Sequence, residues 1–430
     1  MKLLHRRIAI LLPLLVSFDV SALPAAPLIE LRHILPVPPG RGGRSGQSIA
    51  VGGGSVFVGS PFDNTQIIGG GSVSIFDLKS GAHLTSIDPV VPELWGRFHK
   101  VAANADTLVI GAGGDWNSRD DLAGFEYMFD PSNGSLLSEL QPPSDAIFNN
   151  GDRAIDGDLL VVGGLNIAGV DDIANASLRQ LALVYDLNTG SHVATLNPGI
   201  GPQRNDYSLA IHADFVLLGS NPTNAAFGTA ILFDARSGRR LRRFAPANGI
   251  SGFGDAVALN SEYALVGRPY IGYLRNFPGE VYVFDMATGQ QLAKWTASDS
   301  HPDTYFGAEI AMNDRYAVIG APGGRRGEES VGGKAYVFEL ATGREVAILS
   351  PDGNRATSNF GESIDIDGNT IVIGATGLGP VFVYEIIPEP NSVAMFMVTG
   401  LLVLVHAPRA LRSCRLFIDR STGLNAPRNI

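Results

Sequence analysis

The chain has 430 residues, of which 52 are glycine and only 17% are charged, and its formal net charge is −10. This composition suits tight turns and half-buried strands, and the acidic balance argues against nucleic acid as a partner, because phosphate contacts need a basic face. The single cysteine, Cys414, excludes an internal disulfide framework and a paired-thiol site.

Residues 1–26 have the layout of a secretory signal peptide. Three basic residues within the first seven positions precede an apolar run over residues 8–16, and small residues follow. The apolar run is too short to span a bilayer. We therefore expect export, with cleavage after Ala22, Ala25 or Ala26.

Two sequence markers recur between residues 27 and 386. The first is an apolar strand that ends in glycine, usually followed by a small residue, and the second is an aromatic residue and an acid before a glycine-closed turn. The second marker runs from Phe76-Asp77 to Phe338-Glu339, with a truncated copy at Tyr384-Glu385. The glycines of the first marker lie 48 to 56 residues apart: Gly59, Gly111, Gly163, Gly219, Gly267, Gly320 and Gly374. This spacing is typical of four-stranded propeller blades. The markers predict an all-β fold, a seven-bladed β-propeller of four-stranded blades.

The ends of the repeat region predict how the ring closes. The last repeat lacks a fourth strand, because Ile386 is followed closely by Pro388. Residues 28–35 precede the first repeat and are strand-like in composition. We expect this N-terminal strand to complete the last blade, which would close the ring and remove exposed strand edges.

The stretch from Tyr305 to Leu349 is the best-formed repeat. It combines Phe306-Gly307 with Ile319-Gly320-Ala321-Pro322 and resembles the FG-GAP repeats of integrin-like propellers. Phe253-Gly254 and Phe360-Gly361 match the same pattern. The resemblance spans about residues 40–387, with degenerate copies in blades two to four.

The resemblance raises the question of calcium, because integrin-type repeats often carry a calcium loop between their first two strands. The turns at these places are too short to wrap an ion, as at Asn313-Asp314. Asp365, Asp367 and Asn369 alternate, but Asp367-Gly368 reads as a hairpin turn. We therefore expect no metal site and no cofactor.

The chain carries no nucleophile elbow, zinc-protease motif or phosphate loop, so the sequence predicts a protein that is not an enzyme. The connections on one face of the ring are long, and such loops are where rigid scaffolds carry binding residues. They are residues 60–71, 112–124, 164–180, 220–228, 268–279 and 321–333. Aromatic side chains and carboxylates within them suit a sugar or a protein partner. The candidate binding residues are Trp116, Asp115, Asp120, Asp121, Asp171, Asp172, Tyr270, Tyr273 and Phe277.

Five arginines form the basic cluster of the chain: Arg236, Arg239, Arg240, Arg242 and Arg243. They fall on a turn and outer strand of blade four. A solvated face, where charge protects a strand edge, is the favoured interpretation, and a polyanion site is the alternative.

Residues 387–415 resemble a bacterial PEP-CTERM sorting signal. Pro388-Glu389-Pro390 is followed by an apolar run over residues 393–405 and then by three arginines, in an order that would hold a translocated chain in the inner membrane. The resemblance implies a short transmembrane helix and processing by an exosortase. Family members usually end at the arginines, whereas residues 416–430 follow here, and we expect these to be a disordered tail.

Together these patterns predict an exported adhesion or binding module at the cell surface or in the extracellular matrix of a Gram-negative-type bacterium. Its expected ligand is a glycan or a surface protein, met by the long-loop face. The alternative is a carbohydrate-active hydrolase or lyase that uses carboxylates on the same face.

Overall fold

The fold was examined in a computed structural model. It describes residues 27–38, 43–63, 70–88, 97–113, 124–169, 179–199, 208–220, 228–246, 252–269, 277–299, 301, 304–323, 325–326, 329–330, 332–351, 359–376 and 379–387. The predicted signal peptide, sorting signal and C-terminal tail lie outside these residues.

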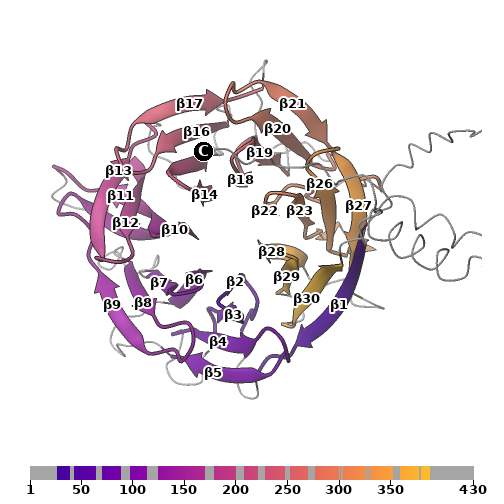
Figure 1. Ribbon diagram of the computed structural model, residues 1–430, viewed down its shortest axis with the longest axis horizontal. Coiled ribbons are helices and arrows are strands. Elements are labelled where there is room, and N and C mark those ends of the chain that lie inside the picture. Colours follow the sequence, from indigo (N-terminus) through magenta and orange to yellow (C-terminus); the bar gives the residue numbers. More distant parts are fainter. Residues whose placement is uncertain are drawn as a thin grey trace, which may run out of the picture. The chain divides into compact units, whose positions relative to one another are not determined.

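Residues 29–387 form a compact unit of seven four-stranded antiparallel sheets arranged in a ring, as predicted (Figure 1). The innermost strands are β2 (Ser48–Gly52), β6 (Arg97–Ala103), β10 (Ala146–Asp156), β14 (Ser208–His212), β18 (Val257–Leu259), β22 (Glu309–Met312) and β28 (Phe360–Asp367). The second strands are β3 (Ser55–Ser60), β7 (Leu108–Gly113), β11 (Leu159–Asn166), β15 (Phe215–Ser220), β19 (Tyr263–Arg268), β23 (Tyr316–Ala321) and β29 (Thr370–Ala375).

The third strands are β4 (Ser72–Asp77), β8 (Phe125–Phe129), β12 (Arg179–Asp186), β16 (Thr229–Asp234), β20 (Glu280–Asp285), β26 (Lys334–Glu339) and β30 (Val381–Ile387). The outer strands are β5 (His83–Ile87), β9 (Leu136–Leu140), β13 (Ser191–Leu196), β17 (Arg240–Phe244), β21 (Gln291–Trp295), β27 (Arg344–Leu349) and β1 (Leu28–Leu35). A short hairpin, β24 (Arg325–Arg326) and β25 (Glu329–Ser330), occupies part of the segment that was predicted to be a long loop.

The N-terminal strand closes the ring, as predicted. β1 pairs with β30, so blade seven combines the two ends of the repeat region (Figure 1). Arg32 donates from Nε to Glu385 on β30 at 2.6 Å. Leu35, only 2% exposed, joins the core between blades seven and one.

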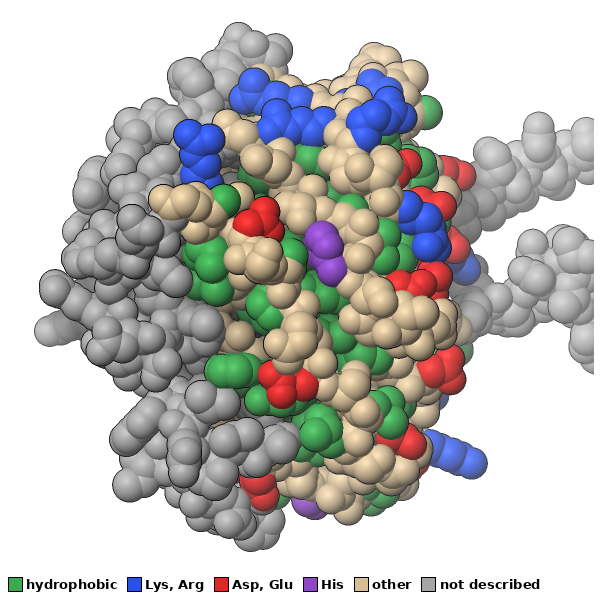
Figure 2. Space-filling model, turned by 90° about the vertical axis from the view of Figure 1, so that its left-hand side faces the viewer, with side chains coloured by type: hydrophobic (Ala, Val, Ile, Leu, Met, Phe, Trp, Pro, Cys, Tyr) green, Lys and Arg blue, Asp and Glu red, His purple; other side chains and the backbone are tan. Residues whose placement is uncertain are grey.

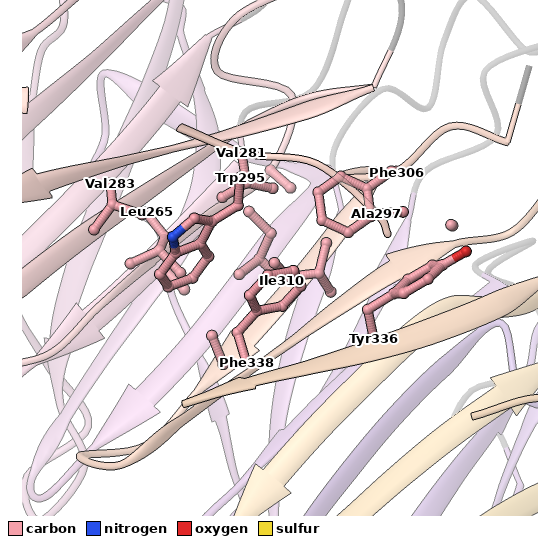
Figure 3. Close-up of a cluster of buried hydrophobic side chains, with 14 of the residues drawn as sticks. Leu265, Val281, Val283, Trp295, Ala297, Phe306, Ile310, Tyr336 and Phe338 are labelled. Carbon is pink, nitrogen blue, oxygen red and sulfur yellow. The ribbon is translucent and has the colours of Figure 1, made fainter. Parts of the chain in front are cut away.

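The core lies between blades, because each sheet is buried on both faces. In the cluster between blades five and six, Trp295 stacks on Phe338 at a centroid distance of 4.8 Å and an interplanar angle of 7° (Figure 3). Phe306, which is fully buried, lies edge-on to Tyr336 in the same cluster. Tryptophan on an outer strand is therefore a packing residue that joins two blades.

The glycine of the first marker is required by the packing of adjacent blades. A Cβ added to Gly320 of β23 would overlap the carbonyl oxygen of Gly361, at the start of the next blade. Gly361 itself has a φ of 89°, a conformation that favours glycine. The Phe-Gly pair of one blade thus packs directly against the marker glycine of the blade before it, where no side chain intervenes.

The acid of the second marker caps the turn that follows it. Asp234 accepts hydrogen bonds from the backbone N–H and hydroxyl of Ser237, at 2.8 and 2.6 Å. Asp285 accepts the same pair of bonds from Thr288. These hydrogen bonds hold the pKa of both carboxyls below its usual value. The acid therefore shapes the turn and is not a spare ligand.

Candidate functional site: the axial cavity

Eight of the nine predicted binding residues lie outside the described residues. They are Trp116, Asp115, Asp120, Asp121, Asp171, Asp172, Tyr270 and Tyr273. The sorting motif Pro388, Glu389 and Pro390 also lies outside. These assignments remain predictions.

Phe277 is the predicted binding residue that the structure describes. The Arg268 guanidinium lies over its ring, 4.7 Å from the centroid. Arg268 also forms an ion pair with Glu280 at 3.0 Å, and Tyr282 donates to the same carboxylate at 2.8 Å. Phe277 is half-buried on this polar network, so it combines a packing role with an accessible surface.

The innermost strands of all seven blades surround an axial cavity of about 680 Å³. Its lining is unusually rich in acids for a ring built by apolar packing. The lining carboxylates are Asp152, Asp156, Asp255, Asp314, Asp365, Asp367, Glu309 and Glu362, and the lining cations are Lys100 and Arg153, with His212.

The residues of the innermost strands that pair with the marker glycines lie at one level along the cavity. The strand register pairs Lys100 with Gly111 and Glu309 with Gly320, and Asp152 takes the corresponding place at a bulge in β10. Lys100 and Asp152 form an ion pair at 3.1 Å. The charged residues of this level therefore come from blades two, three and six.

Glu309 carries the most perturbed carboxyl of this level. Removal from water raises its pKa to about 8, and the carboxylates of Asp152, Asp255 and Asp365 add to the effect, while Lys100 opposes it. Glu309 therefore holds a proton more tightly than an ordinary glutamate does. Asp152 holds the pKa of Lys100 above its usual value, so this lysine stays charged.

Asp365 is the charged residue at the next level, where the innermost strands pair with the residue two positions before each marker glycine. Its register partner is Val372, and the matching position is alanine in each of the other six blades: Ala50, Ala102, Ala154, Ala210, Ala258 and Ala311. Asp365 accepts a hydrogen bond from the backbone N–H of Val51 in blade one, at 2.8 Å. Burial raises the pKa of Asp365 to about 6. This carboxyl therefore lies on the axis and bridges the last and first blades.

Side-chain amides join neighbouring blades at the tight-turn end of the cavity. Asn104 donates to Gly157 at 2.9 Å, Asn260 to Asn313 at 3.2 Å, and Asn313 to Gly368 at 2.7 Å. Asp156 accepts from the backbone N–H of Ala213 at 2.6 Å. The polar groups at this end therefore link neighbouring blades of the ring.

The axial cavity was not predicted from the sequence. Lys100, Asp152, Glu309 and Asp365 each occupy a strand that reads as ordinary repeat sequence. Superposing the seven repeats on their marker glycines reveals the signal, because it aligns Asp365 with six alanines. Asp152 of one blade meets Lys100 of another only when the blades pack into a ring. Local sequence patterns therefore cannot predict this contact.

Metal binding has no support in the part of the chain that the structure describes, where no group of three or more His, Cys, Asp and Glu side chains is placed to hold an ion. Within the same residues, no helix is long and apolar enough to cross a membrane. The predicted span at 393–405 lies outside them.

Two segments match the FG-GAP repeat. They are residues 290–338 and 344–380, which cover the junctions of blades five to seven. The FG-GAP match thus falls where the Phe-Gly pairs Phe306-Gly307 and Phe360-Gly361 lie against the preceding blade. No curated protein matches the chain. The fold is a seven-bladed β-propeller, and two of its segments are similar to the FG-GAP repeat.

Proposed function

We propose that the protein is an exported, non-enzymatic binding module of a bacterial cell surface or extracellular matrix. The observation that carries the proposal is a closed ring of seven blades around an axial cavity, in which two segments match the FG-GAP repeat. We expect the long connections between the blades to lie on one face of this ring. A rigid ring holds variable loops in fixed relative positions, which favours recognition of an extended ligand.

The proposed ligand is a glycan or a surface protein that meets the long-loop face. Aromatic rings offer flat apolar surface at little entropic cost, and carboxylates accept hydrogen bonds from sugar hydroxyls or protein donors. Trp116 and Tyr273 are the aromatic anchors that we propose, and Phe277, which follows Tyr273 closely in sequence, adds a half-buried surface.

The proposed route to the surface uses both chain ends. The signal peptide at 1–26 would direct export, and the apolar run at 393–405 would retain the precursor in the inner membrane until an exosortase processes it near Pro388-Glu389-Pro390. Mass spectrometry of the exported protein tests this route. A mature chain that ends before Arg409 supports it, and one that retains Arg415 contradicts it.

Adherence of purified protein to the producer's own matrix tests the binding surface. Trp116→Ala and Tyr273→Ala should each weaken adherence. The matched control is Leu292→Ala, because Leu292 is 51% exposed on the outer strand β21 and lies away from the loop face. Unchanged adherence in both loop variants would refute this face as the binding surface.

A carbohydrate-active hydrolase or lyase is the second candidate, and Glu309 is the observation that favours it. Glycoside cleavage uses one protonated and one ionised carboxyl. Glu309, with its pKa raised to about 8, and Asp152, which forms an ion pair with Lys100, both line the axial cavity. Release of reducing ends from matrix glycans, lost in Glu309→Gln, would establish the enzyme; no release from any matrix fraction would exclude it.

A further inference from the structure

The arginine cluster of blade four concentrates positive charge on a protein whose formal net charge is −10. It lies on β17 and the turn before it, and β17 is the outermost strand of its sheet. Figure 2, which faces the side of the ring that holds β13, shows Lys and Arg side chains gathered along the upper edge, where Figure 1 places β17.

Carboxylates neutralise one member of the cluster. Arg236 donates from Nε to Asp214 at 2.7 Å and from Nη2 to Asp158 at 3.1 Å. These ion pairs hold the pKa of Arg236 above its usual value. Arg236 therefore contributes little net charge to the surface.

Three other arginines donate side-chain hydrogen bonds to neutral oxygens. Arg240 donates from Nε and Nη2 to the Asn197 carbonyl, at 2.9 and 2.6 Å, and Arg242 donates to the carbonyls of Ala287 and Thr288. Arg243 donates from Nε to the Thr229 hydroxyl at 2.8 Å. A neutral acceptor fixes the position of a guanidinium but leaves its charge in place.

The contacts also spread the charge along the outer wall. Arg240 reaches blade three and Arg242 reaches blade five, while Arg239 and Arg243 are exposed on blade four. The charge of Arg239 lowers the pKa of Asp234, and the charge of Arg242 lowers that of Asp285. Both carboxylates, however, accept hydrogen bonds within their own turns. We call Arg239, Arg240, Arg242 and Arg243 the arginine rim.

We infer that the arginine rim is a second binding surface, which takes a carboxylated polysaccharide. Guanidinium groups present paired N–H donors that match a carboxylate, and anchored groups lose little entropy on binding. A row of spaced cations suits a polymer with one carboxylate on each repeating unit. This inference rests on the proposed function, since a surface or matrix module is one that would meet such a polymer. A nucleic acid is disfavoured because the rim is one strand wide on an acidic protein.

Binding of the full-length protein to immobilised polygalacturonate tests the inference. The matched ligand is the methyl ester of the same polymer, which keeps the sugar and removes the charge. The protein should bind the acid form and not the ester, and added salt should weaken the binding. Equal binding to the two polymers, or no binding to the acid form at low salt, would overturn the inference.

Two variants separate the rim from the cluster as a whole. Arg239→Gln with Arg243→Gln should weaken binding about tenfold, equivalent to roughly 1.4 kcal/mol. Arg236→Gln is the matched control and should change binding by less than about twofold, because its charge is already neutralised. If the double variant loses its β-sheet circular dichroism, Arg239→Gln alone replaces it, since the Arg239 side chain makes no hydrogen bond or ion pair among the described residues. An unchanged affinity in the rim variant would contradict the inference.

Three further outcomes are decisive. Equal affinity for single-stranded DNA, lost in the same variant, would make the rim a general polyanion surface and would overturn the polysaccharide assignment. If polygalacturonate binding fails while Trp116→Ala still weakens matrix adherence, the rim is wrong and the proposed function stands. If the rim binds and the loop variants adhere normally, the loop face is wrong instead.

Discussion

Nη2 of Arg153 lies 2.5 Å from Oε1 of Glu126, and both side chains are almost fully buried between blades two and three, at 2% and 1% exposure. The strand register identifies the equivalent positions in the other blades. At the other six blade junctions the position of Glu126 holds valine or alanine, and that of Arg153 holds isoleucine, leucine or valine, as with Val281 and Ile310. One junction of the ring is thus ionic where six are apolar.

We predict that Glu126→Gln destabilises the fold by about 3–5 kcal/mol, because it leaves a buried guanidinium without its counter-charge. Arg153→Ile should cost less, since burial already raises the pKa of Glu126 and the carboxyl can take up a proton. The double change Glu126→Val with Arg153→Ile restores the apolar junction and should be neutral or stabilising. Urea unfolding of the four proteins measures these differences. A double variant less stable than Glu126→Gln would contradict the account.

Gly320→Ala tests the packing of one blade against the next. The new Cβ would overlap the Gly361 carbonyl, so the blades must separate, and we expect a loss of about 2–4 kcal/mol. Gly54→Ala is the matched control. Gly54 has a φ of 77° but open space around it, so its substitution should cost only about 1 kcal/mol. Equal losses in the two variants would contradict a requirement for glycine set by blade contact.

The blade pattern was readable from the sequence because each glycine and each turn acid has a local physical reason. The ring closure by residues 28–35 was also predictable, since the last blade lacked a fourth strand and these residues form a strand that belongs to no other repeat. The Glu126–Arg153 pair was not, because the two residues meet only after blades two and three pack. The carboxyl pKa values of Glu309 and Asp365 likewise depend on the whole ring, which no stretch of sequence displays.

Deletion of residues 28–35 should expose the edge of β30 and open blade seven. We expect a lower melting temperature and concentration-dependent association, because an unpaired edge recruits another strand. A synthetic peptide with the sequence of residues 27–38 should restore the melting temperature when added in excess. Calorimetry and light scattering follow both effects. A deleted chain that stays monomeric and equally stable would refute closure by this strand.

Stability should fall as pH rises through the range in which Glu309 ionises. Its folded-state pKa is about 8, against an ordinary value of 4.5, so the folded state holds the proton more tightly than the unfolded chain. The stabilisation is therefore complete below about pH 4.5 and is lost by about pH 8; Asp365 acts in the same direction up to about pH 6. Water in the cavity reduces the effect, and we expect about 1–2 kcal/mol.

Thermal unfolding at pH 5, 6.5 and 8 measures this dependence. Glu309→Gln cannot ionise, so its melting temperature should fall less between pH 5 and pH 8 than that of the unaltered protein. Asp314→Asn, a change at the solvent-exposed turn beside the cavity, is the control and should keep the full dependence. A Glu309→Gln profile parallel to the parent would show that this carboxyl is already ionised at neutral pH.

The most direct test of the central claim, that the propeller binds without catalysis, is saturable binding of the purified full-length protein to the producer's own matrix, with the matrix glycans analysed before and after. The account predicts saturable binding that leaves the glycans intact and that is unchanged in Glu309→Gln. Failure to bind, or release of sugar fragments that Glu309→Gln abolishes, would contradict it.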